Sequence, residues 1–422
     1  LAQANEEETG SIESRRDLSV SCNMLGKMAQ AKGNLDEAER YYRQFFELTK
    51  IIYEETSTID SRRSLLISNT RLGDIAKVKG DIDTVVNYYT QGYELAKSIC
   101  EATGTIKSRR DLLVSCERLG DIAQSKGDIN GAERYYLQCY EISKKIYEET
   151  GTIKSRQSLS LSFDRLGDIS QAKGNIDSAE RYYRQSYEIS KEIYEETNTI
   201  ESRRGLLISC GKLADILQEK GNTEEIEFYY LQSYEIAKRI YEATGTIESC
   251  GDLSVSCERL GDISQANGNI DDAERYYRQS YEMSKKIYET IGTVKSLQDL
   301  TRSCDRLGNI LHVKGDMEAA LQYYMQWCQS AITIYEATKT VEALDEVIVS
   351  QYKISSAIGF NEISMPYLYS AFEMAENLYK QHADFYGRYK MLAQVLSDVY
   401  KKQGNIEGYE EMQNILKSIS DE

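Results

Sequence analysis

Apolar side chains recur along the chain at helical spacing, in segments of about 20 residues. A clear example consists of four residues at i, i+4, i+7 and i+11: Leu112, Cys116, Leu119 and Ala123. They share one face of a helix that we predict from about Thr105 to Lys126. Gly127 is expected to end this helix, because glycine readily adopts the left-handed conformation that follows many helices.

A second helix is predicted directly afterwards, with Asp128 as its N-cap. It carries two adjacent apolar stripes. One stripe comprises Ala132, Tyr136, Tyr140 and Tyr147, and the other comprises Tyr135, Ile142 and Ile146. A helix this broadly apolar has to be covered on more than one side. We expect its own partner helix to cover one side and the first helix of the next pair to cover the other.

The helix pair recurs seven times at a spacing of 47 residues without insertion. One small residue marks each copy: Gly26, Gly73, Gly120, Gly167, Ala214, Gly261 and Gly308. Copies that bury one another's apolar faces form a solenoid, so the sequence predicts an all-α stack of antiparallel helix pairs over residues 10–338.

The two ends of the chain depart from this unit. Residues 339–422 lose the Leu-Gly signature and are predicted to form degenerate repeats and C-terminal capping helices, with Pro366 in the first turn of a helix. Residues 1–9 match the tail of a second helix, because Glu7-Glu8-Thr9-Gly10 corresponds to Glu148-Glu149-Thr150-Gly151. We expect the chain to begin inside a truncated repeat of a longer protein.

The repeated order Leu-Gly, Ala, Gly, Ala and Tyr resembles the tetratricopeptide repeat. In the third copy these residues are Leu119, Gly120, Ala123, Gly127, Ala132 and Tyr136. The unit is longer than the family's motif of about 34 residues and lacks its terminal proline. The resemblance implies a right-handed superhelix whose first helices line a concave wall. Extended repeats of this kind are known from bacterial multi-repeat proteins.

Composition narrows the possible partners and compartments. The formal net charge is -17, which disfavours nucleic acid, and no apolar run approaches the ~20 residues that span a membrane. The nine cysteines are predicted to be reduced, because five of them recur in the helix core at multiples of 47 residues. The closest pair, Cys250 and Cys257, would lie ~10.5 Å apart along a helix, too far for a disulfide. We therefore expect a cytoplasmic protein.

The residues offer little material for catalysis. Only two histidines occur, His312 and His382, and neither a phosphate-binding loop, a nucleophile elbow nor a Cys-x-x-Cys pair is present. We predict no enzyme activity, no metal and no cofactor, and we interpret His312 as a polar residue of the groove or surface.

Acidic residues gather on the face that the resemblance assigns to the concave wall. Two positions, four residues apart on each first helix, supply the predicted acidic groove: Glu117, Asp121, Asp164, Asp168, Asp215, Glu258, Asp262 and Asp305. Like charges at i and i+4 repel each other by a few tenths of a kcal/mol. Their recurrence therefore indicates a basic partner or a compensating cation.

A second interpretation explains the same stripe without a partner. Arg118 and its equivalents stand three residues before the second acidic position, so that Arg118 can pair with Asp121 on its own helix. Copies that descend from one unit would also share such charges by inheritance. The sequence does not separate a self-paired stripe from an acidic binding floor.

Two further sets of polar residues lie on the same face. Seven residues upstream, arginines form a basic edge: Arg16, Arg63, Arg110 and Arg204. One turn downstream, glutamines can hydrogen-bond an extended peptide backbone: Gln124, Gln171, Gln218 and Gln265. The paired Lys and Asn with which co-chaperone members of the family hold a C-terminal carboxylate are missing, so chaperone-tail binding is not expected.

Most of the 33 tyrosines fall at four phases of the second helix and are predicted to pack in the core. Aromatic residues outside that pattern form the candidate C-terminal interface: Trp327, Tyr367, Tyr369, Tyr386 and Tyr389. Two functions follow. The chain is a non-catalytic scaffold that holds an extended, basic segment of a protein or peptide partner in its groove. Alternatively, it is a self-associating, spacer or sensor module that regulates an effector domain outside this sequence.

Overall fold

The computed structural model describes residues 10–221 and 223–419, and within that range the chain is helical. The prediction for residues 1–9 lies outside the described residues. The first helices of the seven pairs are α2 (Ile12–Ala31), α4 (Ile59–Lys79), α6 (Ile106–Ser125), α8 (Ile153–Ala172), α10 (Ile200–Lys220), α12 (Ile247–Ala266) and α14 (Val294–Lys314). The second helices are α3 (Leu35–Thr56), α5 (Ile82–Thr103), α7 (Ile129–Thr150), α9 (Ile176–Thr197), α11 (Thr223–Thr244), α13 (Ile270–Ile291) and α15 (Met317–Thr338).

The C-terminal part continues with helices of the same kind. It contains α16 (Val341–Ile358), α17 (Met365–Gln381), the short 3-10 helix η1 (Ala383–Phe385), α18 (Tyr386–Gln403) and α19 (Ile406–Ser418). Pro366 lies in the first turn of α17, as predicted. The predicted all-α repeat solenoid is confirmed.

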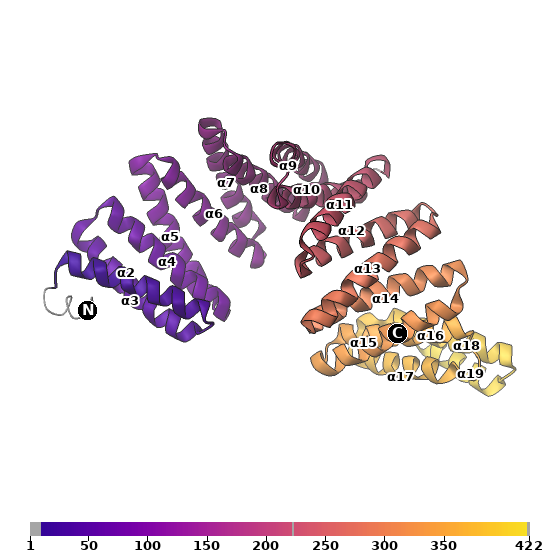
Figure 1. Cartoon of the computed structure of the whole chain (residues 1–422). Coiled ribbons are helices and arrows are strands. Elements are labelled where there is room, and N and C mark those ends of the chain that lie inside the picture. The colour runs from indigo at the N-terminus through magenta and orange to yellow at the C-terminus, as the bar shows by residue number, and fades with distance from the viewer. Residues whose placement is uncertain (1–9, 222, 420–422) are drawn as a thin grey trace. The chain divides into compact units, whose positions relative to one another are not determined.

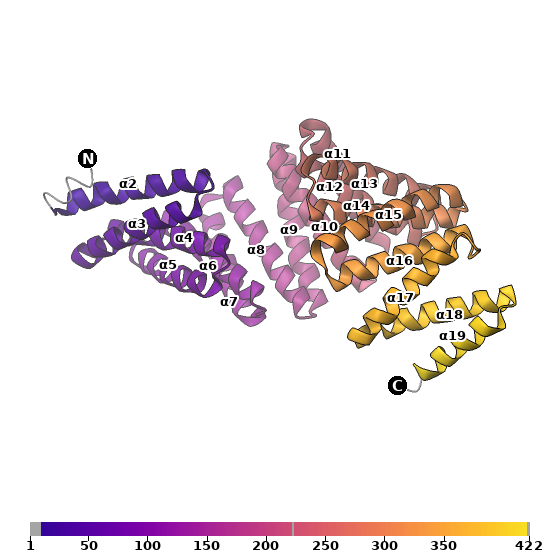
Figure 2. The ribbon, with the colours of Figure 1, turned by 90° about the horizontal axis from the view of Figure 1, so that it is seen from below.

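The chain divides into two compact units, which we describe separately. The N-terminal unit is Leu1–Asn222 and contains α2 to α10, and the C-terminal unit is Thr223–Glu422 and contains α11 to α19. Within each unit a helix packs against the helices before and after it in the chain (Figures 1 and 2). The boundary falls inside the fifth copy, the one in which Ala214 replaces the recurring glycine.

Local sequence signals set the helix ends. The hydroxyl of Thr105 caps α6 by accepting a hydrogen bond from the backbone N–H of Ser108. Gly127 adopts a φ of +76° just beyond that helix, and the side chain of Asp128 accepts from the N–H of Gly131 to begin α7. The predicted helix end and N-cap are therefore confirmed in this copy.

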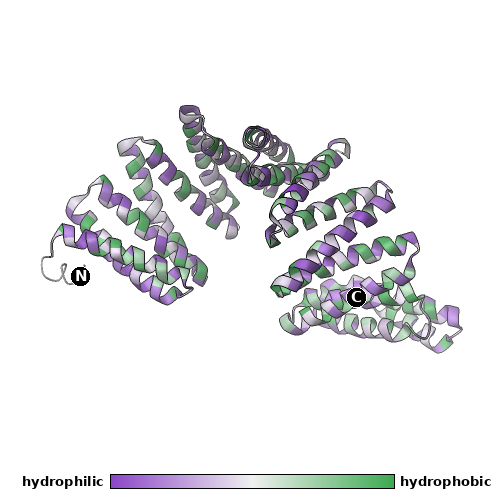
Figure 3. Ribbon diagram, in the orientation of Figure 1, coloured by the Kyte–Doolittle hydropathy of each residue, from purple (hydrophilic) through white to green (hydrophobic). Residues whose placement is uncertain are grey.

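Hydrophilic and hydrophobic residues alternate along the helices (Figure 3), and the apolar ones meet between neighbouring helices. All nine cysteines are free thiols, as predicted, and eight of them are buried. Among the helices that the structure describes, none has both the length and the apolar character needed to cross a membrane.

Each recurring glycine lies directly beneath a buried tyrosine of the second helix. A Cβ atom built on Gly120 would lie 2.5 Å from Cε1 of Tyr136, whose side chain is fully buried. The other pairs of this kind are Gly26 with Tyr42, Gly73 with Tyr89, Gly167 with Tyr183, Gly261 with Tyr277 and Gly308 with Tyr324. The missing side chain lets the two helices of a copy approach until the ring lies on the backbone.

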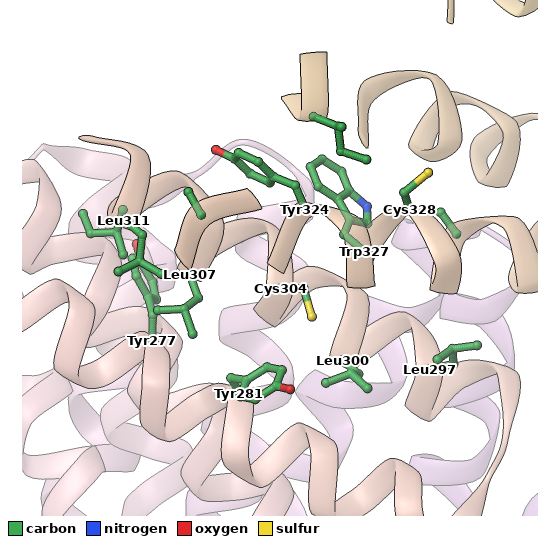
Figure 4. Close-up of a cluster of buried hydrophobic side chains, with 14 of the residues drawn as sticks. Tyr277, Tyr281, Leu297, Leu300, Cys304, Leu307, Leu311, Tyr324, Trp327 and Cys328 are labelled. Carbon is green, nitrogen blue, oxygen red and sulfur yellow. The ribbon is translucent and has the colours of Figure 1, made fainter. Parts of the chain in front are cut away.

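Two residues of the predicted C-terminal interface belong to the core, so that prediction is wrong for them. Trp327 packs among the buried side chains of α13 to α16 (Figure 4), and its indole N–H donates to Oε2 of Glu346 at 2.8 Å. Tyr389 is buried against the rings of Phe372 and Tyr379. The helices α16 to α18 extend the stack, so these aromatic residues face a neighbouring helix and not solvent.

The other three aromatic residues of that set are more accessible. Tyr367 and Tyr386 are half-buried. Tyr369 is exposed, and its hydroxyl oxygen lies 2.9 Å from that of Tyr400 on α18.

Replacing Gly120 with alanine should lower the free energy of unfolding by about 1–3 kcal/mol, because the new methyl group overlaps the fixed ring of Tyr136. Gly205→Ala is the matched control. A Cβ there meets no atom within 4 Å, so the gain in helix propensity should stabilise α10 by about 0.5–1 kcal/mol. Urea unfolding followed by circular dichroism measures both. Equal effects of the two substitutions would contradict the close-approach role of Gly120.

Candidate binding face of the first helices

The five first helices of the N-terminal unit carry a row of exposed apolar side chains. We call it the apolar row, and its members are Val20, Ile67, Val114, Leu161 and Ile208. They stand 47 residues apart, one on each of α2, α4, α6, α8 and α10, and are 39% to 60% exposed. Single exposed apolar residues are common on protein surfaces, but a set repeated in register on successive helices offers a partner a regular series of apolar contacts.

The sequence analysis missed this row, although its period was visible in the chain. Each member stands five residues before the leucine of the Leu-Gly pair. Apolar residues at helical spacing are usually assigned to the core, and only the structure shows that these point outwards. In the C-terminal unit the same position holds Val255, which is 49% exposed, and then Arg302, where the apolar pattern ends.

The aspartates of the predicted acidic groove are tied into the stack. The hydroxyl of Tyr136 donates to Oδ1 of Asp121 at 2.7 Å, and the guanidinium of Arg165 on the next first helix lies 3.2 Å from the same oxygen. The equivalent triads are Tyr89–Asp74–Arg118, Tyr183–Asp168–Lys212 and Tyr277–Asp262–Arg306. In each triad the cation of one copy reaches the carboxylate of the preceding copy.

The cation of each triad also lies over the tyrosine ring. The guanidinium carbon of Arg165 is 5.7 Å from the centroid of Tyr136, and Nζ of Lys212 is 5.5 Å from that of Tyr183. Burial raises the pKa of the Tyr136 phenol, and the hydrogen bond to Asp121 raises it further, so the hydroxyl stays a donor at neutral pH. The triads therefore act as polar clamps between consecutive copies.

The self-paired interpretation of the acidic stripe placed the partner of Arg118 on its own helix, at Asp121. The structure pairs Arg118 with Asp74 of the preceding copy instead. The reason is that the arginine side chain extends over the ring of Tyr89 to the neighbouring first helix.

The predicted glutamines border the same triads. Oε1 of Gln124 accepts from Tyr136 at 3.0 Å, and Oε1 of Gln265 accepts from Tyr277 at 3.0 Å. Gln171 accepts from Tyr183 and donates its amide to Glu219 on α10 at 2.7 Å. Asp215 and Gln218 lie on α10 at the corresponding positions, half-buried and exposed, and both have partners in the structure.

The predicted basic edge is half-buried except at Arg16, which is exposed. Nε of Arg63 lies 3.3 Å from Oδ2 of Asp111 on the next first helix. Arg110 and Arg204 occupy the same position on α6 and α10 and are half-buried as well, and Arg204 also has partners in the structure.

The remaining predicted acids form a second, deeper position, one turn before the aspartates of the triads. Burial raises the pKa of all four carboxyl groups at this position: Glu117, Asp164, Glu258 and Asp305. Glu258 accepts from the hydroxyl of Ser280 at 3.2 Å, and Asp305 accepts from the amide of Asn309 at 2.6 Å. Oδ1 of Asp164 is buried without a hydrogen-bond partner.

Asp164 lines a cavity of about 360 Å³ between α8 and α10. Leu161 and Ile208 of the apolar row form its sides, Ile193 of α9 contributes from below, and Gly205 leaves one wall open. Most of the accessible lining is apolar. No group of three His, Cys, Asp or Glu side chains suited to a metal ion occurs among the residues that the structure describes.

Family models of the tetratricopeptide repeat match five segments of the chain. One model matches residues 19–57 and 254–290, and another matches 113–146, 162–193 and 301–330. The chain belongs to the tetratricopeptide repeat superfamily. The resemblance that the Leu-Gly pattern indicated is thus confirmed, and the matched segments lie in five of the seven predicted copies. Members of this repeat family are generally scaffolds and not catalysts.

Solved structures of repeat proteins share the fold. The apo form of RapI is 13% identical with a TM-score of 0.57, and the comparison covers 96% of this chain and 98% of that one. The apo form of the quorum sensor NprR from B. thuringiensis is 15% identical with a TM-score of 0.51, covering 93% and 99% of the two chains. At such low identity the likeness concerns the fold alone. No curated protein sequence matches the chain significantly.

The clamps predict a measurable coupling between copies. In a double-mutant cycle, Arg165→Met and Asp121→Asn should each lower the free energy of unfolding by about 0.5–1.5 kcal/mol, with a coupling of about 0.5–1 kcal/mol, since both side chains are about one-third exposed. The surface pair Lys126–Asp83, whose aspartate is almost fully exposed, is the control and should show a coupling near zero. A coupling no larger than in the control would contradict the clamp.

Asp164→Asn should stabilise the N-terminal unit at neutral pH. Burial raises the pKa of Asp164 to about 6, well above the usual value of about 3.9, so the folded state carries an unfavourable charge above pH 6. The wild type regains that free energy as the pH falls from about 6 towards 4. The variant should therefore be more stable by about 1–3 kcal/mol at pH 7.5, and the difference should shrink at pH 4. Urea unfolding at both pH values tests this, and a destabilised variant at pH 7.5 would contradict it.

Proposed function

We propose that the chain is a non-catalytic receptor that binds an extended segment of a partner protein along the first helices of its N-terminal unit. The observation that carries this proposal is the apolar row, from Val20 to Ile208. It offers one exposed apolar contact per copy along α2, α4, α6, α8 and α10. An extended segment presents its side chains at regular intervals and can follow such a row from copy to copy.

The charged residues beside the apolar row are consistent with an apolar contact surface, because they already have partners within the chain. Arg118, Arg165 and Lys212 are already bound to aspartates of the preceding copy, so a partner does not have to satisfy them. Burying the row therefore removes apolar area from water with little loss of charge solvation. This modifies the sequence-based hypothesis, in which the aspartates themselves held the partner.

A basic partner remains the better match. The chain has a formal net charge of -17, so a basic segment is attracted over the distance of the Debye length of about 8 Å at physiological salt. On the first-helix face the carboxylate of Asp164 lacks a full set of partners, whereas the nearby cations have theirs. NprR, one protein of the same fold, is described as a quorum sensor, and a sensing role for this chain would be in keeping with that.

The alternative of self-association through the C-terminal end stays a prediction with less support. Of the five aromatic residues predicted there, Tyr369 alone is exposed among the described positions. Sedimentation at several concentrations separates the two proposals, because a receptor of the first kind is complete as a monomer.

Selection from a library of random dodecapeptides on the whole chain tests the receptor proposal. Peptides that bind should lose about tenfold in affinity with Val114→Ser or Ile208→Ser, because each substitution removes a contact worth about 1.5 kcal/mol. Leu137→Ser is the control, since Leu137 is similarly exposed but lies on the second helix α7. Fluorescence anisotropy measures the affinities. Selected peptides that bind all variants equally would remove the apolar row from consideration.

A further inference from the structure

The cavity between α8 and α10 interrupts the apolar row at one place. Leu161 and Ile208, consecutive members of the row, stand on its two sides, and Ile193 lies deeper. Its volume of about 360 Å³ falls at the lower end of ligand pockets. A segment that follows the row therefore passes over an opening large enough for a side chain.

Two small residues create this opening. Gly205 stands where other copies have aspartate or serine, such as Ser158 and Asp252 in the two adjacent copies, and a Cβ on it would meet no atom within 4 Å. Ser160 stands where three copies have a larger leucine, Leu66, Leu113 and Leu207, and where the other three copies have Ser19, Ser254 and Thr301. A cavity also lies at the equivalent place three copies later, so what distinguishes this one is the combination of Gly205 and Ser160 with Asp164.

The cavity contains a carboxylate that is incompletely satisfied. Asp164 is only 7% exposed, it lines the cavity, and its Oδ1 has no hydrogen-bond partner. A buried hydrogen-bond acceptor without a partner lowers the stability of the fold, and a buried charge without a partner lowers it further. A ligand group that donates a hydrogen bond at this point would remove the cost.

The surrounding charges favour a cation. Lys212 and Arg165 also line the cavity, but Lys212 is bound to Asp168 at 2.5 Å and Arg165 to Asp121 at 3.2 Å, so both cations already have a carboxylate partner. Glu201 adds a second carboxylate to the lining. Asp164 and Glu201 are therefore the charged groups of the lining that are not bound to a charged partner, and a cationic ligand group complements them.

Buried serines at and below the cavity limit the geometry of the hydrogen bonds that a ligand can donate to Asp164. Four buried hydroxyls, those of Ser160, Ser186, Ser190 and Ser209, are hydrogen-bonded to one another at 2.9 to 3.2 Å. A hydrogen bond from Ser186 also favours the ionised form of Asp164 and lowers its pKa, against the larger effect of burial. With Ser186 on this carboxylate and Oδ1 open, a single-point donor fits better than a guanidinium, which prefers to bind both oxygens.

We propose that this cavity is a pocket for one lysine side chain of the bound segment, whose ammonium group donates to Asp164 while its aliphatic stem lies against Leu161 and Ile208. The inference rests on the proposed function and adds the chemistry of one residue of the partner. Lysine meets both demands of the pocket, because its stem is apolar and its charge is compact.

An equivalent cavity in the C-terminal unit supports this assignment by contrast. It lies between α14 and α16, measures about 480 Å³ and contains Asp305 and Glu346. Asp305 accepts from Asn309, and Glu346 accepts from Trp327. Arg302 replaces the leucine at its mouth. The acids of this second cavity have hydrogen-bond donors, and Arg302 lies at its opening. We therefore do not expect it to bind an ammonium group, and it serves as an internal control for the binding test.

The probe for the test is n-butylammonium, which matches a lysine side chain, added to the whole chain with labelled isoleucine methyl groups. In NMR titrations at pH 7.5 the signals of Ile193 and Ile208 should shift, while that of Ile334 in the C-terminal cavity should not. n-Butylguanidinium and n-butyltrimethylammonium should bind at least fivefold more weakly. Shifts of Ile334 alone, or equal binding of all three cations, would overturn the proposal.

Two variants test the pocket independently. Asp164→Asn should weaken n-butylammonium binding at least tenfold. Gly205→Met should abolish it by filling the cavity, in a helix that it does not disturb, because the added Cβ meets open space. Gly251→Met on α12 is the matched control, since that helical glycine is also open. Unchanged binding by both Asp164→Asn and Gly205→Met would overturn the proposal even if one variant folded poorly.

Acid should weaken binding as Asp164 becomes protonated, with a midpoint near pH 6. The charged and polar groups that face this carboxyl are Arg165 and Asp168 of α8, Ser186 of α9 and Lys212 of α10. The loss should be absent in Asp164→Asn, which has no carboxyl group to protonate at this position. Binding that is constant from pH 7.5 to 5 would contradict the role of Asp164.

The selected dodecapeptides separate this inference from the proposed function. Replacing their lysine by norleucine or arginine should weaken binding at least fivefold to the wild type and have little effect with Asp164→Asn. If Val114→Ser weakens peptide binding but Asp164→Asn does not, the lysine pocket is wrong and the receptor proposal stands. If neither variant weakens it, both are wrong.

Discussion

The close approach of a glycine on each first helix to a buried tyrosine on the second is the contact on which the rest of the stack depends. Without a side chain at Gly120, the ring of Tyr136 lies on the helix backbone, and its hydroxyl emerges beside Asp121. That carboxylate then receives Arg165 from the next copy. The absence of a side chain at Gly120 thus fixes the distance between the two helices of a copy. It also positions the hydroxyl of Tyr136, and with it the polar clamp between consecutive copies.

This use of charge explains the character of the first-helix face. Most of its aspartates and cations form ion pairs between consecutive copies. The charged residues that the sequence assigned to an acidic groove therefore mainly hold the repeats together. The groups left over are the exposed apolar row and a few deeper carboxylates. In the proposed receptor, a face of this kind would discriminate by shape and apolar contact, with charge acting locally.

Much of this architecture was predictable, because one unit repeated in register reveals which residues share a role. The helix ends at Gly127 and Asp128 and the buried cysteines follow from local rules and period. The partner of Arg118 did not follow, since it depends on how far a side chain reaches towards the neighbouring copy. Trp327 was misjudged because loss of period was interpreted as exposure, whereas α16 covers it. The cavity depends on residues of three helices, so no single segment of sequence reveals it.

Repetition also gives a standard against which a functional site can be recognised. Copies that follow the repeated pattern are explained by stability alone. Gly205, Ser160 and Asp164 instead line an open cavity, in which one oxygen of the buried acid lacks a hydrogen-bond partner. At the equivalent place three copies later, Asp305 is satisfied by Asn309, so the fold itself does not require the cost. A buried acid that lacks a partner and opens onto the exposed apolar row is what a ligand would be expected to complete.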